Sequence, residues 1–242
     1  MSRLERHRRD WDRLASEDPL WAVLTDPARR GGRWTVEEFL ATGEDEIAGV
    51  LDEAAELGLP ARRGAALDFG CGAGRLTRAL SLRFERAVGV DISAEMVRVA
   101  RELNADRPNC EFLVNAAPDL AILETGSVDF AYSSIVLQHV PGRALALAYV
   151  RELVRVLADD GLLVFQVPQR LAPLRRLQLA RRLYSAVRTL GVPETALLRR
   201  TPLTPMRMQA IPEHDVRSAV DEVGGEILRV DAGTGRYLAA RT

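Results

Sequence analysis

The sequence of 242 residues contains no lysine, so all 33 of its basic residues are arginines, set against 34 acidic residues. Its two cysteines, Cys71 and Cys110, are too few for a disulfide framework and favour a reducing, cytoplasmic setting. No apolar run is long enough for a transmembrane helix, and the charged start lacks the apolar stretch of a secretory signal. The net charge of −1 argues against a generally basic nucleic-acid binder. We therefore expect a globular cytoplasmic protein that makes no membrane contact.

A regular alternation of strand and helix patterns fills the middle of the chain. Short apolar runs predict strands, helical stripes of apolar residues separate them, and a tight turn at 233–235 predicts a closing antiparallel pair. This alternation predicts an α/β fold with a doubly wound, mostly parallel sheet and an antiparallel C-terminal strand. The expected strands are 65–69, 87–90, 110–114, 128–133, 162–167, 226–230 and 236–240.

The remaining segments are expected to belong to the same single domain, 1–242. Within the N-terminal part, residues 37–56 predict an amphipathic helix with eight acidic residues and no basic one. A second helical stripe runs from Ala146 to Leu157 and is expected to end at Asp160-Gly161. The expected parts are a helical N-terminal lid (1–60), the α/β core (62–167), a helical insert on the substrate side (168–211), and a last helix with the strand pair (212–242).

The strongest local signal is a glycine-rich turn, Gly70-Cys71-Gly72-Ala73-Gly74, between the first expected strand and the helix after it. Glycines allow a sharp turn and the close approach of a ligand, and the free N–H groups of a helix start attract an anionic group. Asp91 ends the second strand, where a carboxylate can accept hydrogen bonds from both hydroxyls of a ribose. Together these features predict a site for a nucleoside-bearing cofactor. The glycine spacing differs from the dinucleotide pattern G-x-G-x-x-G, which disfavours an NAD-dependent oxidoreductase.

Asp68, two residues before the first glycine, completes the string Asp-Phe-Gly-Cys-Gly-Ala-Gly. This string resembles the first motif of class I S-adenosylmethionine-dependent methyltransferases. Residues 88–93 resemble the second motif of that family, residues 128–140 its fourth, and residues 153–163 the approach to its fifth strand. The resemblance covers about 62–167. It implies a Rossmann-like, seven-stranded sheet and S-adenosylmethionine as the cofactor.

The resemblance also implies which residues contact this cofactor. The glycine turn would face its methionine part, with Asp68 reaching towards the amino group, and the segment after the fourth strand would lie beside the sulfonium. Asp91 would hold the ribose, and the residues after the second and third strands would cover the adenine. The twelve implied cofactor residues are Asp68, Gly70, Cys71, Gly72, Gly74, Asp91, Ile92, Met96, Asn115, Ala116, Ser134 and Ile135.

Only three histidines are available as general bases. Methyl transfer from a sulfonium is an in-line displacement that needs alignment and exclusion of water, and a hydroxyl acceptor benefits from a base. His139 follows the fourth strand, where the ligand crevice is expected, and is the candidate base; a structural loop histidine is the alternative. His214 at a helix start and His7 in the charged N-terminal segment are expected in solvent. No spacing of His, Cys and acidic residues predicts a metal site.

The acceptor side is expected to come from the lid and the insert. Trp34 from the lid, with Tyr184 and Met208 from the insert, are candidate acceptor-pocket residues, and packing in a satellite core is the alternative for the aromatic lid residues. Eight arginines and one acid lie between residues 170 and 200. This arginine-rich segment fits a solvated face paired with the acidic 37–56 helix, a dock for an acidic partner or an anionic substrate, or a contact with RNA.

The sequence thus predicts an enzyme that transfers a methyl group from S-adenosylmethionine to an oxygen or nitrogen of a small molecule. The fourth motif, Ser133-Ser134-Ile135-Val136, differs from the Asn-Pro-Pro-Tyr type of methyltransferases that act on base amines, which counts against methylation of nucleobase amines. Methylation of RNA or of a carrier-bound substrate stays an alternative. So does a protein that binds the cofactor without transferring the methyl group.

Overall fold

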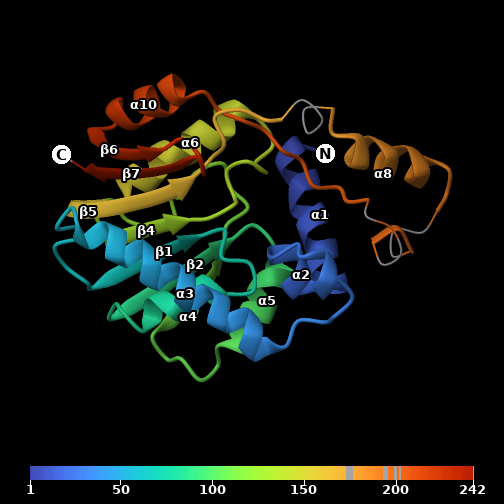
Figure 1. The fold of residues 1–242 in the computed structure, drawn as a ribbon, viewed down its shortest axis with the longest axis horizontal. Coiled ribbons are helices and arrows are strands. Elements are labelled where there is room, and N and C mark those ends of the chain that lie inside the picture. The colour runs from blue at the N-terminus through green and yellow to red at the C-terminus, as the bar shows by residue number, and fades with distance from the viewer. Residues whose placement is uncertain (173–176, 193–195, 199–200, 202, 242) are drawn as a thin grey trace.

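The computed structural model describes residues 1–172, 177–192, 196–198, 201 and 203–241. Helices form most of the first 55 residues, and strands alternate with helices from residue 65 onward (Figure 1). The strands are β1 (Ala65–Phe69), β2 (Arg86–Asp91), β3 (Cys110–Val114), β4 (Val128–Ser133), β5 (Leu157–Gln166), β6 (Gly225–Asp231) and β7 (Arg236–Arg241). The helices are α1 (Arg3–Glu17), α2 (Pro19–Val23), the 3-10 helix η1 (Pro27–Arg29), α3 (Val36–Ala55), α4 (Arg75–Ser81), α5 (Ala94–Leu103), α6 (Arg143–Arg155), α8 (Leu179–Thr189) and α10 (Glu213–Asp221).

The strands form one seven-stranded sheet in the order β3-β2-β1-β4-β5-β7-β6. The first five strands pair in parallel, with Leu67 of β1 opposite Val88 of β2 and Ala131 of β4. Strand β7 runs antiparallel to both of its neighbours, β5 and β6. The predicted doubly wound sheet with an antiparallel C-terminal strand is therefore confirmed. Because parallel strands end at the same edge, the C-terminal ends of β1 to β4 lie together.

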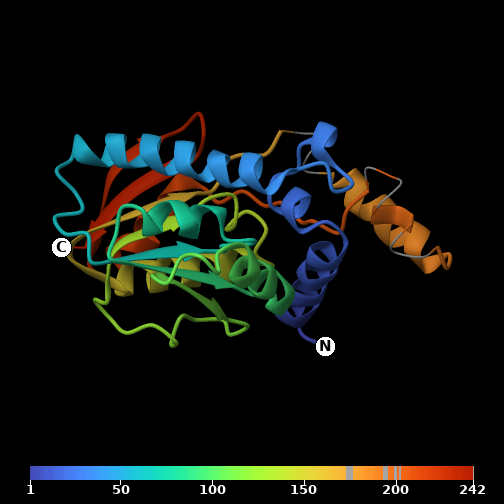
Figure 2. The ribbon, with the colours of Figure 1, turned by 90° about the horizontal axis from the view of Figure 1, so that it is seen from below.

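Helices cover both faces of the sheet (Figure 2). Alternate residues of each strand point to opposite faces, so Leu67 and Val88 pack in the cluster that includes residues of α6 and α10. Ala66 and Phe130 pack with α3 and α4 on the other face. Burial on both faces explains why these strands are near-continuous apolar runs in the sequence.

The boundary between α6 and β5 differs from the prediction. The helical stripe ending at Leu157 was expected to close at Asp160-Gly161, but α6 ends at Arg155 and Leu157 already belongs to β5, opposite Val128. Asp160 has a φ of 61°, and the register between β4 and β5 shifts at this point. Leu157 therefore continues the helical stripe in the sequence but packs from the irregular start of β5. Periodicity alone does not distinguish such a strand start from a last helical turn.

The predicted acidic helix forms as α3 and lies directly on the start of α4. A Cβ atom on Gly43 would lie 2.4 Å from the carbonyl oxygen of Arg75, so only glycine permits this approach. Glu46, one turn further on, accepts a 2.7 Å hydrogen bond from Arg75 Nη2 and a 2.8 Å bond from the Tyr132 hydroxyl. Arg75 follows the glycine-rich turn immediately, so α3 fixes the position of that turn.

Helices α1, α2 and α8 stand beyond the C-terminal edge of the parallel strands, with α8 projecting from the body (Figures 1 and 2). The Ser93 hydroxyl at the start of α5 donates a 2.8 Å hydrogen bond to Asp12 of α1. Leu14 of α1, Met96 of α5 and Tyr184 of α8 belong to one buried cluster, which docks both added helices on the core. Within the described parts of the chain, no helix has the length and apolar character needed to cross a membrane.

Candidate active site

A cavity of about 600 Å³ lies where the parallel strands end beneath α1. Its volume is in the range that holds small ligands. Residues at or just after the strand ends line one part: Phe69, Gly70, Cys71, Gly72, Asp91, Ile92, Asn115, Ser134, Ile135 and Val136. Residues of the added segments line the other part, including Leu4, His7, Trp11, Val23, Leu179, Arg181, Met206 and Met208.

The glycine-rich turn forms a close-fitting wall of this cavity. Gly70 and Gly72 have φ values of 80° and 52°, in the left-handed region that favours glycine. A Cβ atom on Gly70 would lie 2.3 Å from Val136, and one on Gly72 would lie 2.5 Å from Val23. Asp91 accepts a 2.9 Å hydrogen bond from the Gly72 N–H and a 2.8 Å bond from the Ser93 N–H, which tie the end of β2 to the turn. Burial raises the pKa of Asp91 from its ordinary value.

Asp68 and Gly74 lie behind the turn, outside the cavity lining. The Thr77 hydroxyl donates a 2.7 Å hydrogen bond to one carboxylate oxygen of Asp68, and the other oxygen has no partner within the described structure. Burial raises the pKa of Asp68 to about 7. The Thr77 hydroxyl and the nearby charge of Arg75 act in the opposite direction and lower this pKa. Gly74 has a φ of 84° and begins α4, where a Cβ atom would lie 2.7 Å from Asn104.

The segments after β3 and β4 complete the strand side of the cavity. Ile135 has a φ of 60°, a strained conformation for a β-branched residue that occurs mostly at functional sites. Ser134 and Asn115 line the cavity beside it. The Asn115 amide donates a 2.6 Å hydrogen bond to the carbonyl of Asp119, so this side chain also holds its own loop. The predicted neighbour Ala116 does not line the cavity.

Comparison with known families covers this same region. Residues 67–165 match the family described as a methyltransferase domain, from β1 through the glycine-rich turn and Asp91 to β5. This stretch of the chain is therefore similar to a methyltransferase domain. The first and fourth motifs of the family resemblance therefore coincide with the turn and the strained segment that line the cavity.

Two relatives of the methyltransferase domain have named activities. The chain is 32% identical over 138 residues to a trans-aconitate 2-methyltransferase from Azoarcus sp., covering 56% of this chain and 51% of that protein. It is 32% identical over 111 residues to a ubiquinone biosynthesis O-methyltransferase from Xanthomonas campestris, covering 46% of this chain and 44% of that protein. The chain thus spans about half the length of these curated relatives.

Solved structures extend the likeness in fold to the whole chain. Magnesium protoporphyrin IX methyltransferase from Synechocystis PCC 6803, crystallised with S-adenosylmethionine, superposes with a TM-score of 0.62 at 18% sequence identity, covering 100% of this chain and 98% of that one. A methyltransferase from Clostridium acetobutylicum superposes with a TM-score of 0.57 at 15% identity, covering 79% and 89% of the two chains. At these identities the comparison shows the fold alone.

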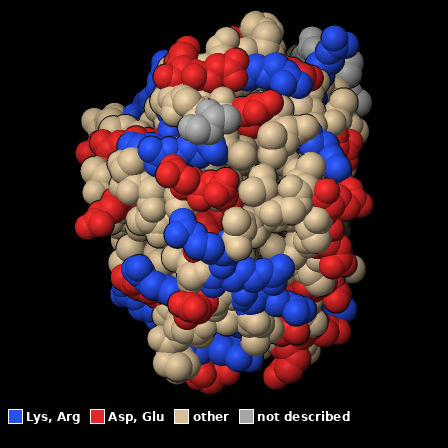
Figure 3. Space-filling view, turned by 90° about the vertical axis from the view of Figure 1, so that its left-hand side faces the viewer, with Lys and Arg blue, Asp and Glu red and all other residues tan. Residues whose placement is uncertain are grey.

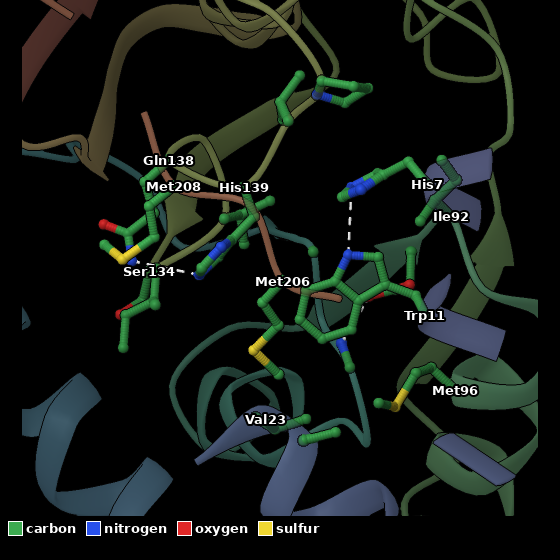
Figure 4. Close-up of a pocket in the computed structure, with 18 of the residues that line it drawn as sticks. His7, Trp11, Val23, Ile92, Met96, Ser134, Gln138, His139, Met206 and Met208 are labelled. Carbon is green, nitrogen blue, oxygen red and sulfur yellow. Dashed lines mark hydrogen bonds between the residues drawn. The ribbon is translucent and has the colours of Figure 1, made fainter. Parts of the chain in front are cut away.

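His139 lines the cavity after β4, at the predicted edge of the sheet. Its Nδ1 faces the carbonyl oxygen of Arg207, which can only accept, so Nδ1 carries the proton. Nε2 is then an acceptor, and the Gln138 amide donates to it over 3.3 Å (Figure 4). Burial lowers the pKa of His139, so the ring is neutral at pH 7 with its lone pair on Nε2.

His7 corrects the prediction that it lies in solvent. It is partly buried and lines the cavity from α1, across from His139 (Figure 4). Its Nε2 accepts a 3.2 Å hydrogen bond from the Trp11 indole, and the Trp11 ring meets the His139 ring edge-on at 6.0 Å. Burial, with repulsion from His139 and Arg207, lowers the pKa of His7 to about 4. His7 is surrounded by charged residues in the sequence, so the sequence did not show that one face of α1 packs against the core.

Replacing His7 with glutamine should change how stability depends on pH. The unfolded chain binds a proton at His7 below about pH 6.5, whereas the folded protein binds it only below about pH 4. Stability should therefore fall between pH 6.5 and 4, by up to about 3 kcal/mol from this group alone. In His7→Gln this part of the fall should be missing, as measured by urea unfolding at each pH. The difference between the two proteins should be constant above pH 7, and parallel curves down to pH 4 would contradict the prediction.

The structure separates the three predicted acceptor residues. Met208 lines the cavity beside Met206 and Gln138 (Figure 4). Trp34 does not; its ring packs edge-on against Phe39 at 6.1 Å. Tyr184 is buried in the cluster that docks α8 and does not line the cavity either. Neither of these two aromatic side chains is among the described residues that line the cavity, and the satellite-core alternative fits Trp34 of the lid.

The predicted pairing between the arginine-rich segment and the acidic helix is also absent where the structure describes both. Acidic residues of α3 and the residue after it pair instead with Arg29, Arg75, Arg229 and Arg236. Four of the eight arginines between 170 and 200 lie outside the described residues. Over the described ranges, no three His, Cys, Asp or Glu side chains are grouped as a metal site would require.

Proposed function

We propose that the protein transfers a methyl group from S-adenosylmethionine to an oxygen atom of a small molecule. The observation that carries this proposal is a single cavity shared by the glycine-rich turn, Asp91 and His139. The first two are suited to a nucleoside cofactor, and the third is a neutral imidazole with its lone pair on Nε2. The names of the relatives, one of them an O-methyltransferase, support oxygen as the methylated atom.

Each side chain has a defined part in this proposal. Asp91 would accept the ribose hydroxyls, and Ile92 and Met96 would cover the adenine. The cofactor, when bound, supplies a sulfonium-activated methyl group. Ser134 and Ile135 would align the acceptor beside it, and Trp11 and Met206 would exclude water. His139 Nε2 would take the proton of the acceptor hydroxyl.

Calorimetric titration with S-adenosylhomocysteine, beside NAD as the competing nucleoside cofactor, tests the first half of the proposal. We expect saturable micromolar binding of S-adenosylhomocysteine and none of NAD. Incubation with methyl-labelled S-adenosylmethionine and a panel of hydroxylated small molecules, with bulk RNA as a separate sample, tests the second half. Labelling of RNA alone, or cofactor binding without transfer to any sample, would favour the alternatives of an RNA methyltransferase or a non-transferring protein.

The role of His139 predicts a pH profile. Because burial lowers its pKa, the ring should remain a competent base below pH 6.5, and kcat/KM should fall only at more acidic pH. His139→Gln should lower kcat by about 100-fold or more, the usual contribution of a general base. Affinity for S-adenosylhomocysteine should be unchanged in this variant. A variant that keeps its kcat would make His139 a structural residue of the loop.

A further inference from the structure

Four arginines from three separate segments either line the cavity or are next in the chain to residues that line it. Arg3 and Arg6 of α1 flank the lining residue Leu4, with Arg6 next to the lining residue His7. Arg181 of α8 lines the cavity itself, and Arg207 stands between the lining residues Met206 and Met208. Burial, with repulsion from Arg181, Arg3 and Arg6, lowers the pKa of Arg207.

The four guanidinium groups differ from most arginines of the protein in having no carboxylate partner among the described residues. Elsewhere arginine and acidic side chains meet in pairs, such as Arg78 with Asp106 at 2.6 Å and Arg86 with Glu111 at 2.5 Å. The face of the molecule turned away from α8 carries both signs of charge interspersed (Figure 3). Four unpaired like charges repel one another, and an anion placed between them would remove this repulsion.

The surface next to these arginines is apolar. Leu4 and Trp11 from α1, Leu179 from α8, and the flexible side chains of Met206 and Met208 line the cavity between the arginines and the strand ends. Methionine adapts to ligands of irregular shape, and an indole ring offers a flat apolar face. The acceptor part of the cavity therefore runs from an apolar wall beside His139 to a cationic opening.

We propose that the methyl acceptor is an amphiphilic anion, whose apolar body lies against Trp11, Met206 and Met208 and whose carboxylate or phosphate is held by Arg3, Arg6, Arg181 and Arg207. This proposal rests on the proposed function, since it assigns the acceptor of that reaction. The planar guanidinium group binds carboxylate and phosphate oxygens with paired hydrogen bonds, so the anionic group orients the molecule. The hydroxyl at the other end of the acceptor is then directed towards His139 Nε2.

A matched pair of probes tests the charge requirement without knowledge of the natural acceptor. The probes are 1-naphthoate and its neutral amide, 1-naphthamide, which share the same aromatic body. Binding is measured by calorimetry at pH 7.5, with and without saturating S-adenosylhomocysteine. We expect naphthoate to bind about tenfold or more tightly than naphthamide, and to weaken steeply as salt is raised while naphthamide does not.

Variants locate the effect. The double substitution Arg181→Gln, Arg207→Gln should bring the two probes within about twofold of each other. Arg182→Gln is the matched control, because Arg182 follows Arg181 on the same helix, is exposed, and does not line the cavity. The control should keep the full preference for naphthoate. If the double variant fails to fold, the salt dependence of the unmodified protein still measures the charge requirement.

Each outcome separates this inference from the function on which it rests. Equal affinity for the two probes, or no measurable binding of either, would overturn the proposal that the acceptor is an anion. Binding of S-adenosylhomocysteine in the same experiment would leave the proposed function in place. Failure to bind S-adenosylhomocysteine would overturn the proposed function, whatever the probes do. A preference for naphthoate that survives the double substitution would overturn the assignment to these arginines.

Discussion

Replacing Asp91 with alanine should lower the affinity for S-adenosylhomocysteine by about 100- to 1000-fold. In the proposed site the Asp91 carboxylate accepts both ribose hydroxyls, so its removal loses two charge-assisted hydrogen bonds, together about 3 to 4 kcal/mol. Each 1.4 kcal/mol corresponds to a factor of ten in affinity. The variant also loses the bonds from Gly72 and Ser93 to the same carboxylate, which hold the turn in position. Calorimetric titration of the two proteins measures the difference.

Asp106→Ala is the control for this experiment, because Asp106 pairs with Arg78 on the surface, away from the cavity. It should bind S-adenosylhomocysteine as the unmodified protein does. Thermal unfolding should show that both variants are folded at the temperature of the titration. If Asp91→Ala keeps its affinity within tenfold, the ribose is held by other groups and the assignment of Asp91 is wrong.

Replacing Glu46 with alanine should destabilise the protein by about 3 kcal/mol. Arg75 is almost fully buried, with only 3% of its side chain exposed, and Glu46 is its ion-pair partner at 2.7 Å. Removal of one partner leaves a buried charge without compensation, which is among the more damaging changes to a folded protein. The Tyr132 hydroxyl loses its acceptor in the same variant. A lower urea midpoint with an unchanged slope would report this loss of stability.

Two further variants distinguish the effect of the buried ion pair on stability from the effect of removing any charge. Glu102→Ala removes a partner of Arg98 on the exposed surface of α5 and should have a much smaller effect. Glu46→Leu combined with Arg75→Met replaces both charges with apolar side chains and should recover most of the stability lost in Glu46→Ala. If Glu46→Ala is as stable as the control, the ion pair does not fix α3 on α4.

The sequence predicted the parts of the fold that depend on neighbouring residues. Strand periodicity, the glycine-rich turn and Asp91 at the end of β2 are local features, and the confirmed sheet topology follows from them. The acceptor side depends on contacts between distant segments. The position of His7 in the cavity depends on which face of α1 packs on α5, and the Ser93–Asp12 bond that ties the two helices spans 81 positions of the chain.

Two aromatic residues that lie outside the cavity lining show the same limit. Trp34 and Tyr184 are apolar and lie in the added segments, so the sequence could not separate a pocket wall from a small core. Both turned out to pack inside: Trp34 against Phe39, and Tyr184 among residues of α1 and α5. Large aromatic side chains anchor added helices efficiently because they bury much apolar area. Less bulky or more flexible residues, such as Met206 and Met208, then line the space that is left.

The cavity is divided between two kinds of chain segment. The glycine-rich turn, Asp91 and His139 all lie inside the stretch 67–165 that matches the methyltransferase domain, whereas Trp11, Arg181 and Met206 lie outside it. Under the proposed function, substitutions in α1 or in the segment around residues 178–208 should therefore alter the acceptor without disturbing the methyl donor. A library confined to these two stretches would explore new acceptors while the proposed base, His139, stays unchanged, and recombination between relatives at the boundaries of 67–165 would do the same.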